Sequence, residues 1–284
     1  MDFKITIVIP AFNAGQTIGR TLKSLLSSSI RVKVMVVNDG SEDDTATVVS
    51  HISAQHENIS LISQSNTGAY QARLNALKHV TTPYFGFVDA DDEVSATMFE
   101  KMLRAAEAVD ADVVQCGHVE GDIKFAATTG RELLETRQDV LDEYVLPRLV
   151  DGREGAFIWD KIYRNRYEFG GFAKADGLTN FDDYLRNLQF FENVERMAFV
   201  NEPLYRYSIS DCSATHTYSE RKFRDFKKAI CLREALLLRY GIAGNDPLVK
   251  RWKRRNKATS IKTVLRSKNS PWRKIAFIAR LLSL

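Results

Sequence analysis

Apolar strand-like runs alternate with amphipathic helical segments along the first 116 residues, and this alternation limits the possible folds more than any other feature of the chain. Near-continuous apolar strands are buried on both faces, which is typical of a parallel sheet with helices on either side. The sequence therefore predicts the α/β class, with a mostly parallel sheet flanked by helices. The expected strands are residues 5–9, 32–37, 59–63, 84–88 and 112–116, and the expected helices are residues 15–28, 43–55, 67–79 and 95–109.

Polar loops follow four of these strands. Ligands of such sheets bind beyond the carboxyl ends of the strands, so we expect the loops to line one edge. Solvated turns alone explain poorly why four polar loops would converge there. The loops read PAFNAG (10–15), NDGSEDD (38–44), SQSNTG (63–68) and DADDE (89–93).

The last of these loops crowds carboxylates together. Like charges at close range repel unless something positive lies among them. One interpretation is the acidic first turn of a helix, which the helix dipole favours; the other is a metal site. Asp89 and Asp91 are two residues apart and would point to the same side of an extended chain. Their oxygens suit Mg²⁺ or Mn²⁺, which leaves other positions for phosphates and water. Asp92 and Glu93 are interpreted as helix-start acids.

The sequence lacks the common phosphate-binding loops. Neither GxxxxGK[ST] nor a GxGxxG after the first strand is present. P-loop enzymes and nicotinamide dehydrogenases are therefore disfavoured, and the charge of a bound phosphate would need a cation instead.

Seven short motifs occur in one order between residues 5 and 213: VIPAFNAG, VNDGSEDDT, QSNTGAYQAR, FVDADD, WDKIYR, FDD and PLYRYSISDCS. Each motif is weak by itself, but the ordered set resembles family 2 glycosyltransferases of the GT-A fold. The resemblance implies an inverting enzyme that moves a sugar from a nucleotide-diphospho-sugar, by family frequency a UDP-sugar, to a hydroxyl. The implied acceptor is a glycan or lipid-linked molecule in cell-surface polysaccharide synthesis.

The resemblance also implies roles for residues of the first half. It assigns Pro10, Ala11 and Phe12 to the nucleoside, Asp39 to the base, Arg73 to the nucleotide or pyrophosphate, Asp89 to the ribose or the metal waters, and Asp91 to a Mn²⁺ or Mg²⁺ ion. Two alternatives stay open from the residues themselves. Asp39 could be a turn residue of Asp-Gly-Ser, and Arg73 could be an exposed helix arginine.

In the second half the resemblance concerns WDKIYR and FDD. It places Trp159, Asp160 and Lys161 near the donor or acceptor sugar, although Trp159 could equally belong to the core. It makes Asp183 the catalytic base. Asp182 stands where the family usually has glutamate, so Asp182 is the alternative base.

Two other functions remain possible at this stage. A sugar-phosphate nucleotidyltransferase would carry a glycine-rich loop with Lys or Arg after the first strand, which PAFNAGQT lacks. A non-catalytic nucleotide-sugar-binding module would not need both DADD and FDD.

The expected organisation has three parts: residues 1–117 as the nucleotide-sugar-binding half, 118–216 as the acceptor-binding and catalytic half, and 217–284 as a basic helical extension. Further helices are expected around residues 131–149, 178–192 and 219–241, and a short hairpin near 197–207. Pro271 is expected to divide the helical tail into two pieces.

The tail alternates Lys and Arg with apolar residues, a pattern typical of helices that lie in the membrane interface. The alternative is that its apolar stripe packs on the catalytic domain or on a second subunit; no nucleic-acid-reading motif accompanies the charge.

An odd number of widely spaced cysteines favours a reducing compartment. No signal peptide or span of roughly 20 apolar residues is evident. We therefore expect a cytoplasmic protein that is peripheral on the cytoplasmic face of the inner membrane. The sequence does not specify its oligomeric state.

Overall fold

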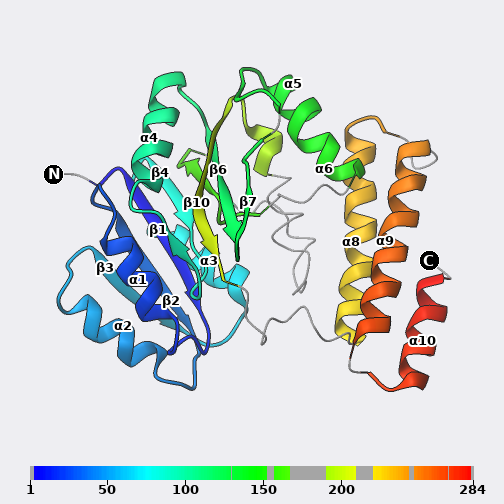
Figure 1. Cartoon of the computed structure of the whole chain (residues 1–284), viewed down its shortest axis with the longest axis horizontal. Helices are drawn as coiled ribbons and strands as arrows, with labels where there is room; N and C mark the ends of the chain where they lie inside the picture. The colour runs from blue at the N-terminus through cyan, green and yellow to red at the C-terminus, as the bar shows by residue number, and fades with distance from the viewer. Residues whose placement is uncertain are drawn as a thin grey trace. The chain divides into compact units, whose positions relative to one another are not determined.

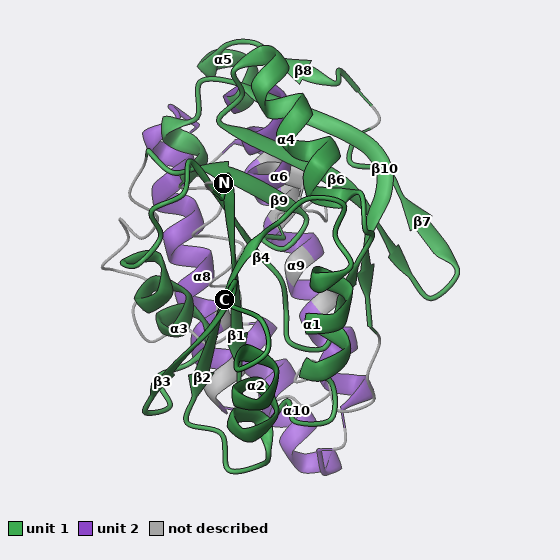
Figure 2. Cartoon of the chain, turned by 90° about the vertical axis from the view of Figure 1, so that its left-hand side faces the viewer, with its two compact units in different colours: residues 1–140, 157–171, 190–209 green, residues 141–156, 172–189, 210–284 purple. Residues whose placement is uncertain are grey.

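The structure is a computed structural model of the full chain. It describes residues 3–128, 130–151, 157–166, 190–208, 220–242, 246–267 and 269–282. The chain divides into two compact units (Figure 2), which we call the sheet unit and the helical unit. The sheet unit comprises residues 1–140, 157–171 and 190–209, and the helical unit comprises residues 141–156, 172–189 and 210–284.

The sheet unit is built on one ten-stranded sheet (Figure 1). Its main path runs β3-β2-β1-β4-β9-β6-β10-β5, while β7 pairs with β6 and β8 pairs with β10. The strands are β1 (Ile5–Ala11), β2 (Lys33–Asp39), β3 (Ile59–Gln64), β4 (Tyr84–Phe87), β5 (Glu93–Val94), β6 (Val113–Glu120), β7 (Ile123–Phe125), β8 (Leu133–Leu134), β9 (Lys161–Arg164) and β10 (Met197–Tyr207).

The longest ladders are parallel, as the apolar runs predict. β1 pairs in parallel with β2 and β4, β2 with β3, and β6 with β10. The short strand β9 is inserted between β4 and β6 and runs antiparallel to both, so the sheet is mixed at its centre. Because β1 to β4 share one direction, their carboxyl ends meet at one edge.

Helices cover both faces of the parallel strands, with α1 and α3 on opposite faces (Figures 1 and 2). Ile18, Leu22 and Leu25 of α1 are buried at helical spacing and join the main core. The helices of this unit are α1 (Ile18–Leu26), α2 (Thr45–Ser53), α3 (Ala69–Leu77), α4 (Met98–Val109) and α5 (Arg137–Asp139). They confirm the four predicted helices to within a few residues at each end.

Two predictions of the second half need correction. Residues 131–149 form β8, α5, a π-helical turn (Val140–Val145) and the start of α6 (Leu146–Asp151), in place of one helix. Residues 197–207 form the single strand β10, in place of a hairpin. Pro203 lies at a register shift of the β10–β6 ladder, where its missing N–H is tolerated. Of the helix expected at 178–192, residues 178–189 lie outside the described part of the chain.

The helical unit contains α8 (Glu220–Arg239), α9 (Pro247–Arg266) and α10 (Pro271–Leu282), together with α6. Pro271 begins α10, where a missing N–H costs nothing, so the predicted division of the tail is confirmed. A small core joins the helices through Phe223, Val264, Phe277 and Leu281. None of the described helices is long and apolar enough to span a bilayer.

Candidate nucleotide and metal site

The sheet register brings the predicted loops together. Val8 lies opposite Phe87 and Ala11 lies opposite Asn38, so the residues after β1, β2 and β4 meet at one edge. Asp39 pairs in register with Gln64 at the end of β3. The edge predicted from the four polar loops is therefore present.

Hydrogen bonds tie the loop after β1 to the loop after β2. The backbone N–H of Ala14 donates to Thr45 Oγ1 at 2.8 Å, and that of Gly15 donates to Asp43 Oδ2 at 2.8 Å. The Thr45 hydroxyl also donates to Asp43, and this bond lowers the pKa of the Asp43 carboxyl. Phe12 stands half exposed beside this fastened loop, whereas Pro10 and Ala11 are buried in β1.

Asp39 is buried at the end of β2 and holds the loop between β3 and α3. Its carboxylate accepts from the N–H groups of Thr67 (2.9 Å) and Gly68 (2.8 Å) and from Gln64 Nε2 (2.8 Å). The next residue, Gly40, has φ +72°, and an added Cβ would lie 2.8 Å from the N of Asn66. Asp39 is thus a loop anchor in this structure, and its contact with a base stays a prediction.

Arg73 is 4% exposed, which excludes the alternative of an exposed helix arginine. Its guanidinium donates to Asp89 Oδ1 at 2.8 Å and lies 5.9 Å from the centre of the Phe87 ring. This charge-assisted bond joins α3 to the loop after β4. Arg73 therefore fixes the direction of the Asp89 carboxylate at the edge of the sheet.

Asp91 lies half buried beside Asp89. Burial, and then the neighbouring Asp89 charge, raise the pKa of the Asp91 carboxyl. Arg20 donates to the main-chain carbonyl of Asp91 at 2.9 Å. No described side chain hydrogen-bonds to the Asp91 carboxylate itself. A divalent cation would relieve the cost of holding two partly desolvated carboxylates together. The donor set therefore fits Mg²⁺ or Mn²⁺, which need only one or two protein carboxylates.

The described residues alone do not form a closed metal cage. Within the ranges that the structure describes, no three His, Cys, Asp or Glu side chains gather closely enough to hold an ion. A cation held by Asp91 and Asp89 would have positions left for water and for a ligand's phosphates.

Asp92 differs from its expected role. It is fully buried and does not begin a helix, because Glu93–Val94 forms β5 and α4 starts at Met98. Its carboxylate accepts from the Tyr205 hydroxyl at 2.6 Å and from the Ser208 N–H at 2.7 Å. Burial, and then the Asp89 charge, raise the pKa of Asp92 to about 7. The interpretation as a helix-start acid is wrong for Asp92, and also for Glu93, which lies in β5.

Tyr205 links Asp92 back to Asp89 in the loop after β4. Its hydroxyl also accepts from the Asp89 N–H at 3.2 Å. The sequence carries no signal for this contact, because Tyr205 lies 113 residues after Asp92 on β10. Glu93 forms an ion pair with Arg20 at 3.2 Å.

The residues of the WDKIYR motif lie in the interior of the sheet unit. Trp159 is buried, and its ring stacks on those of Phe157 and Tyr205. The distances between ring centres are 4.6 Å to Phe157 and 4.3 Å to Tyr205. Asp160 and Lys161 are fully buried and form an ion pair at 2.5 Å. Their contact with a sugar stays a prediction. The expected base, Asp183, and its alternative, Asp182, lie outside the described residues.

The fold and the edge of loops define an α/β transferase of the GT-A type. The chain belongs to glycosyl transferase family 2, whose family model matches residues 6–177. Among curated relatives, the uncharacterized glycosyltransferase EpsJ of Bacillus subtilis (strain 168) is 28% identical over 84% of this chain and 71% of its own length. The uncharacterized glycosyltransferase YibD of Escherichia coli (strain K12) is 26% identical over 76% of this chain and 64% of its own length.

Solved structures share the fold at lower sequence identity. The crystal structure of S. aureus TarS 1–349 in complex with UDP-GlcNAc has a TM-score of 0.60 and 16% identity, covering 99% of this chain and 72% of that chain. The mannosyltransferase PcManGT from Pyrobaculum calidifontis, in complex with GDP-Man and Mn²⁺, has a TM-score of 0.59 and 15% identity, covering 99% of this chain and 79% of that chain.

Proposed function

We propose that this glycosyltransferase moves a sugar from a UDP-sugar to an acceptor hydroxyl with inversion at the anomeric carbon. The observation that carries the proposal is the pair Asp89 and Asp91, half buried at the carboxyl edge of the sheet with Arg73 fixing one of them. A UDP-GlcNAc complex of a protein with this fold supports the choice of nucleotide.

The residues around this pair would position the donor. In the proposed arrangement Pro10, Ala11 and Phe12 border the nucleoside and Asp39 accepts from the base. Asp91, with Asp89, would hold Mg²⁺ or Mn²⁺, which supplies positive charge against a leaving diphosphate. Arg73 keeps Asp89 turned toward the edge of the sheet, and Tyr205 holds the Asp89 backbone from the other side.

The acceptor step would fall to the second half of the sequence. Asp183, with Asp182 as the alternative, would remove the proton of the acceptor hydroxyl as a general base. The hydroxyl would then attack the anomeric carbon from the face opposite the diphosphate, as in other inverting sugar transfers. Trp159, Asp160 and Lys161 are buried at the start of β9, so we assign them a supporting role in this half of the sequence.

We propose a glycan or lipid-linked acceptor in cell-surface polysaccharide synthesis, used at the cytoplasmic face of the membrane. Residues 1–117 would then bind the donor and residues 118–216 the acceptor, with residues 217–284 as an extension.

The test is donor consumption by purified enzyme with a panel of UDP- and GDP-sugars in limiting Mn²⁺ or Mg²⁺. Asp91→Asn should keep the fold and lose most turnover, because a neutral amide is a poorer ligand for a hard cation. The matched control is Asp122→Asn, an exposed acid in the β6–β7 turn. Near-normal turnover of Asp91→Asn would refute Asp91 as the metal ligand. Exchange of sugar phosphate with UTP would indicate a nucleotidyltransferase, and no consumption of any donor would indicate a binding module.

A further inference from the structure

The helical unit presents an apolar surface that its own core does not use. Seven large apolar side chains are strongly exposed in the described part of the chain, and four of them lie between residues 265 and 282. These four, which we call the α10 face, are Leu265, Trp272, Ile275 and Leu282. Trp272 is 81% exposed.

Helix α10 is apolar on two sides. Phe277 and Leu281 are buried against Phe223 and Val264 in the core of the helical unit. Trp272, Ile275 and Leu282 recur at spacings of three and seven residues and therefore share another side of the helix. A cluster of large exposed apolar side chains on a folded protein normally marks a surface that another molecule covers. The outer side of α10 therefore needs a partner.

Contacts inside the helical unit fix which side of α10 faces outward. Arg280 forms an ion pair with Glu220 at 2.8 Å and lies 4.1 Å from the centre of the Phe223 ring. Lys274 Nζ donates to the Leu265 carbonyl at 2.8 Å, which joins the end of α9 to the start of α10. The exposure of the α10 face is thus a consequence of specific packing on the opposite side.

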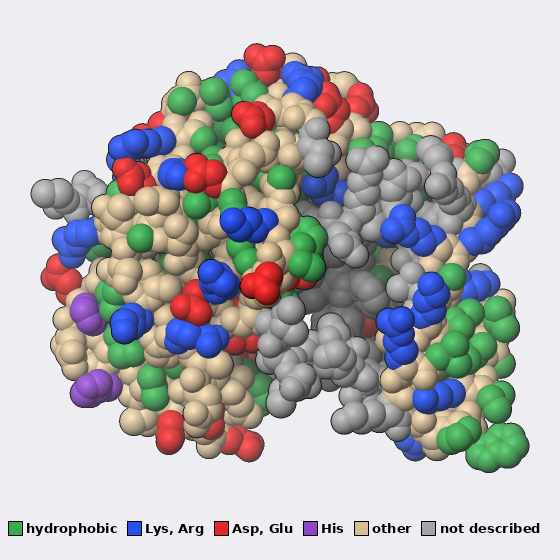
Figure 3. All heavy atoms as spheres, in the orientation of Figure 1, with side chains coloured by type: hydrophobic (Ala, Val, Ile, Leu, Met, Phe, Trp, Pro, Cys, Tyr) green, Lys and Arg blue, Asp and Glu red, His purple; other side chains and the backbone are tan. Residues whose placement is uncertain are grey.

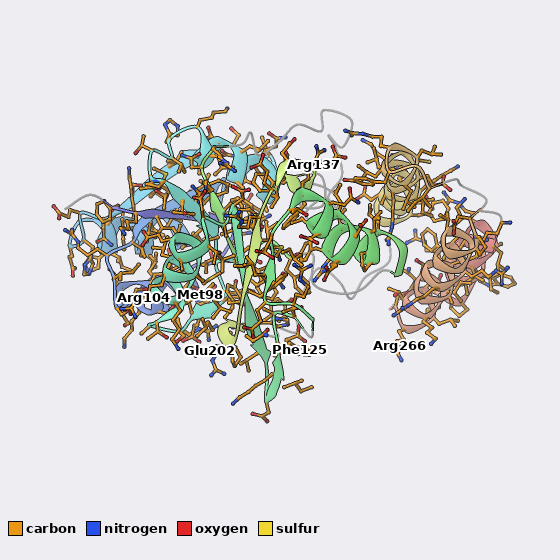
Figure 4. All side chains as sticks on the ribbon, turned by 90° about the horizontal axis from the view of Figure 1, so that it is seen from above. Met98, Arg104, Phe125, Arg137, Glu202 and Arg266 are labelled. Carbon is orange, nitrogen blue, oxygen red and sulfur yellow. The ribbon has the colours of Figure 1, made fainter. Side chains whose placement is uncertain are left out.

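The charge around this face identifies its partner. Residues 247–284 contain 12 Lys and Arg and no Asp or Glu. Arg266 and Arg273 are exposed at the end of α9 and the start of α10, and Figure 4 shows Arg266 on the outside of α9. In Figure 3 apolar side chains gather where α10 lies, with Lys and Arg side chains beside them. A partner of this surface must offer an apolar region to the exposed apolar side chains and negative charge to the Lys and Arg beside them.

We propose that the α10 face docks on an anionic lipid bilayer, with Trp272, Ile275 and Leu282 in the interface and the neighbouring cations against headgroups. Amphipathic basic helices bind bilayers in this way, and tryptophan is favoured at the headgroup level. A symmetric contact with a second copy would bring two such cationic rims together, which like charge opposes.

The structure also divides the apolar stripe of the tail seen in the sequence. Ile261, Val264, Phe277, Ile278 and Leu281 pack in the helical unit itself. Among the described side chains of the tail, the large apolar ones left exposed for a bilayer are those of the α10 face, a smaller set than the sequence pattern suggests. This inference does not depend on the proposed sugar-transfer chemistry.

The experiment is flotation of the full chain with vesicles of phosphatidylglycerol and phosphatidylcholine in equal parts, at low salt. We expect the wild type to float with these vesicles and far less with phosphatidylcholine alone. Trp272→Ala should weaken binding about tenfold through lost apolar burial. Arg266→Gln with Arg273→Gln should weaken binding to the anionic vesicles and reduce its sensitivity to salt.

The matched control is Leu238→Ala. Leu238 is 61% exposed, as apolar as the residues of the α10 face, and lies near the other end of α8 from Phe223. This variant should float like the wild type. Thermal melting and donor hydrolysis without acceptor should be unchanged in both alanine variants, because the altered side chains are exposed and belong to none of the loops of the candidate site.

Three results would overturn the proposal. The first is that the wild type fails to float with the anionic vesicles. The second is that Trp272→Ala and Leu238→Ala bind these vesicles equally well. The third is a lipid-independent dimer, seen by sedimentation velocity, that Trp272→Ala dissociates, since this would assign the α10 face to a second copy.

Discussion

Deleting the buried hydroxyl of Tyr205 should test whether Tyr205 supports the loop after β4, which contains Asp89 and Asp91. Tyr205→Phe keeps the ring, which stacks on Trp159 at 4.3 Å, and deletes only the hydroxyl. That hydroxyl donates to Asp92 at 2.6 Å and accepts from the Asp89 N–H at 3.2 Å. Both partners would lose a hydrogen bond, and the Asp92 oxygen is fully buried.

The expected loss follows from the burial of Asp92. A buried polar group left without a partner costs about 1–3 kcal/mol of unfolding free energy. For a folded unit of this size, each kcal/mol lowers the Tm by about 2–4 °C, so the variant should melt roughly 2–12 °C lower. A less firmly held Asp89 should also raise the Mn²⁺ concentration needed for half-maximal donor consumption.

Calorimetry and a Mn²⁺ titration of donor consumption measure the two effects. Tyr207→Phe is the matched control, because Tyr207 also stacks on Trp159, at 5.8 Å, but its hydroxyl has no hydrogen bond to a described residue. If Tyr205→Phe and Tyr207→Phe have the same Tm and the same Mn²⁺ requirement, the Asp92–Tyr205 contact does not support the loop.

Three further predictions concern other parts of the sheet unit. Gly40→Ala should lower the unfolding free energy by about 1 kcal/mol or more in a urea titration, because Gly40 has φ +72° and its Cβ would meet Asn66; unchanged stability would contradict the tight turn. Lys161→Met should cost about 3–5 kcal/mol, since it leaves Asp160 charged and buried, and an unaltered melting curve would show that the pair is not ionic. Asp183→Asn should abolish transfer while UDP binding, followed by calorimetry, persists; full activity would move the base to Asp182.

Sequence reasoning succeeds where local pattern decides structure. Apart from the short strand β5, the strands and helices up to Glu120 follow from apolar periodicity, and the edge of polar loops follows from the parallel ladders. It fails where distant segments decide. Asp92 reads as a helix-start acid because its partner Tyr205 is on β10, and residues 197–207 read as a hairpin because the ladder that makes them one strand depends on β6.

The burial of the WDKIYR motif is another long-range effect. The resemblance places Asp160 and Lys161 near a sugar, and nothing in the sequence shows that the insertion of β9 between β4 and β6 would bury them. The outward side of α10 has the same origin, since Phe223 on α8 selects which apolar residues of α10 are buried.

The position of β9 in the sheet has a consequence for how the chain is made. A ribosome releases β4 and β6 long before β9, whose residues 161–164 fill the space between them. Until then both strands have an unpaired edge, and such edges recruit other chains. A fragment ending near residue 117 would keep those edges permanently, although it contains every loop of the candidate nucleotide site. We therefore expect it to aggregate during synthesis rather than fold as a separate nucleotide-binding protein.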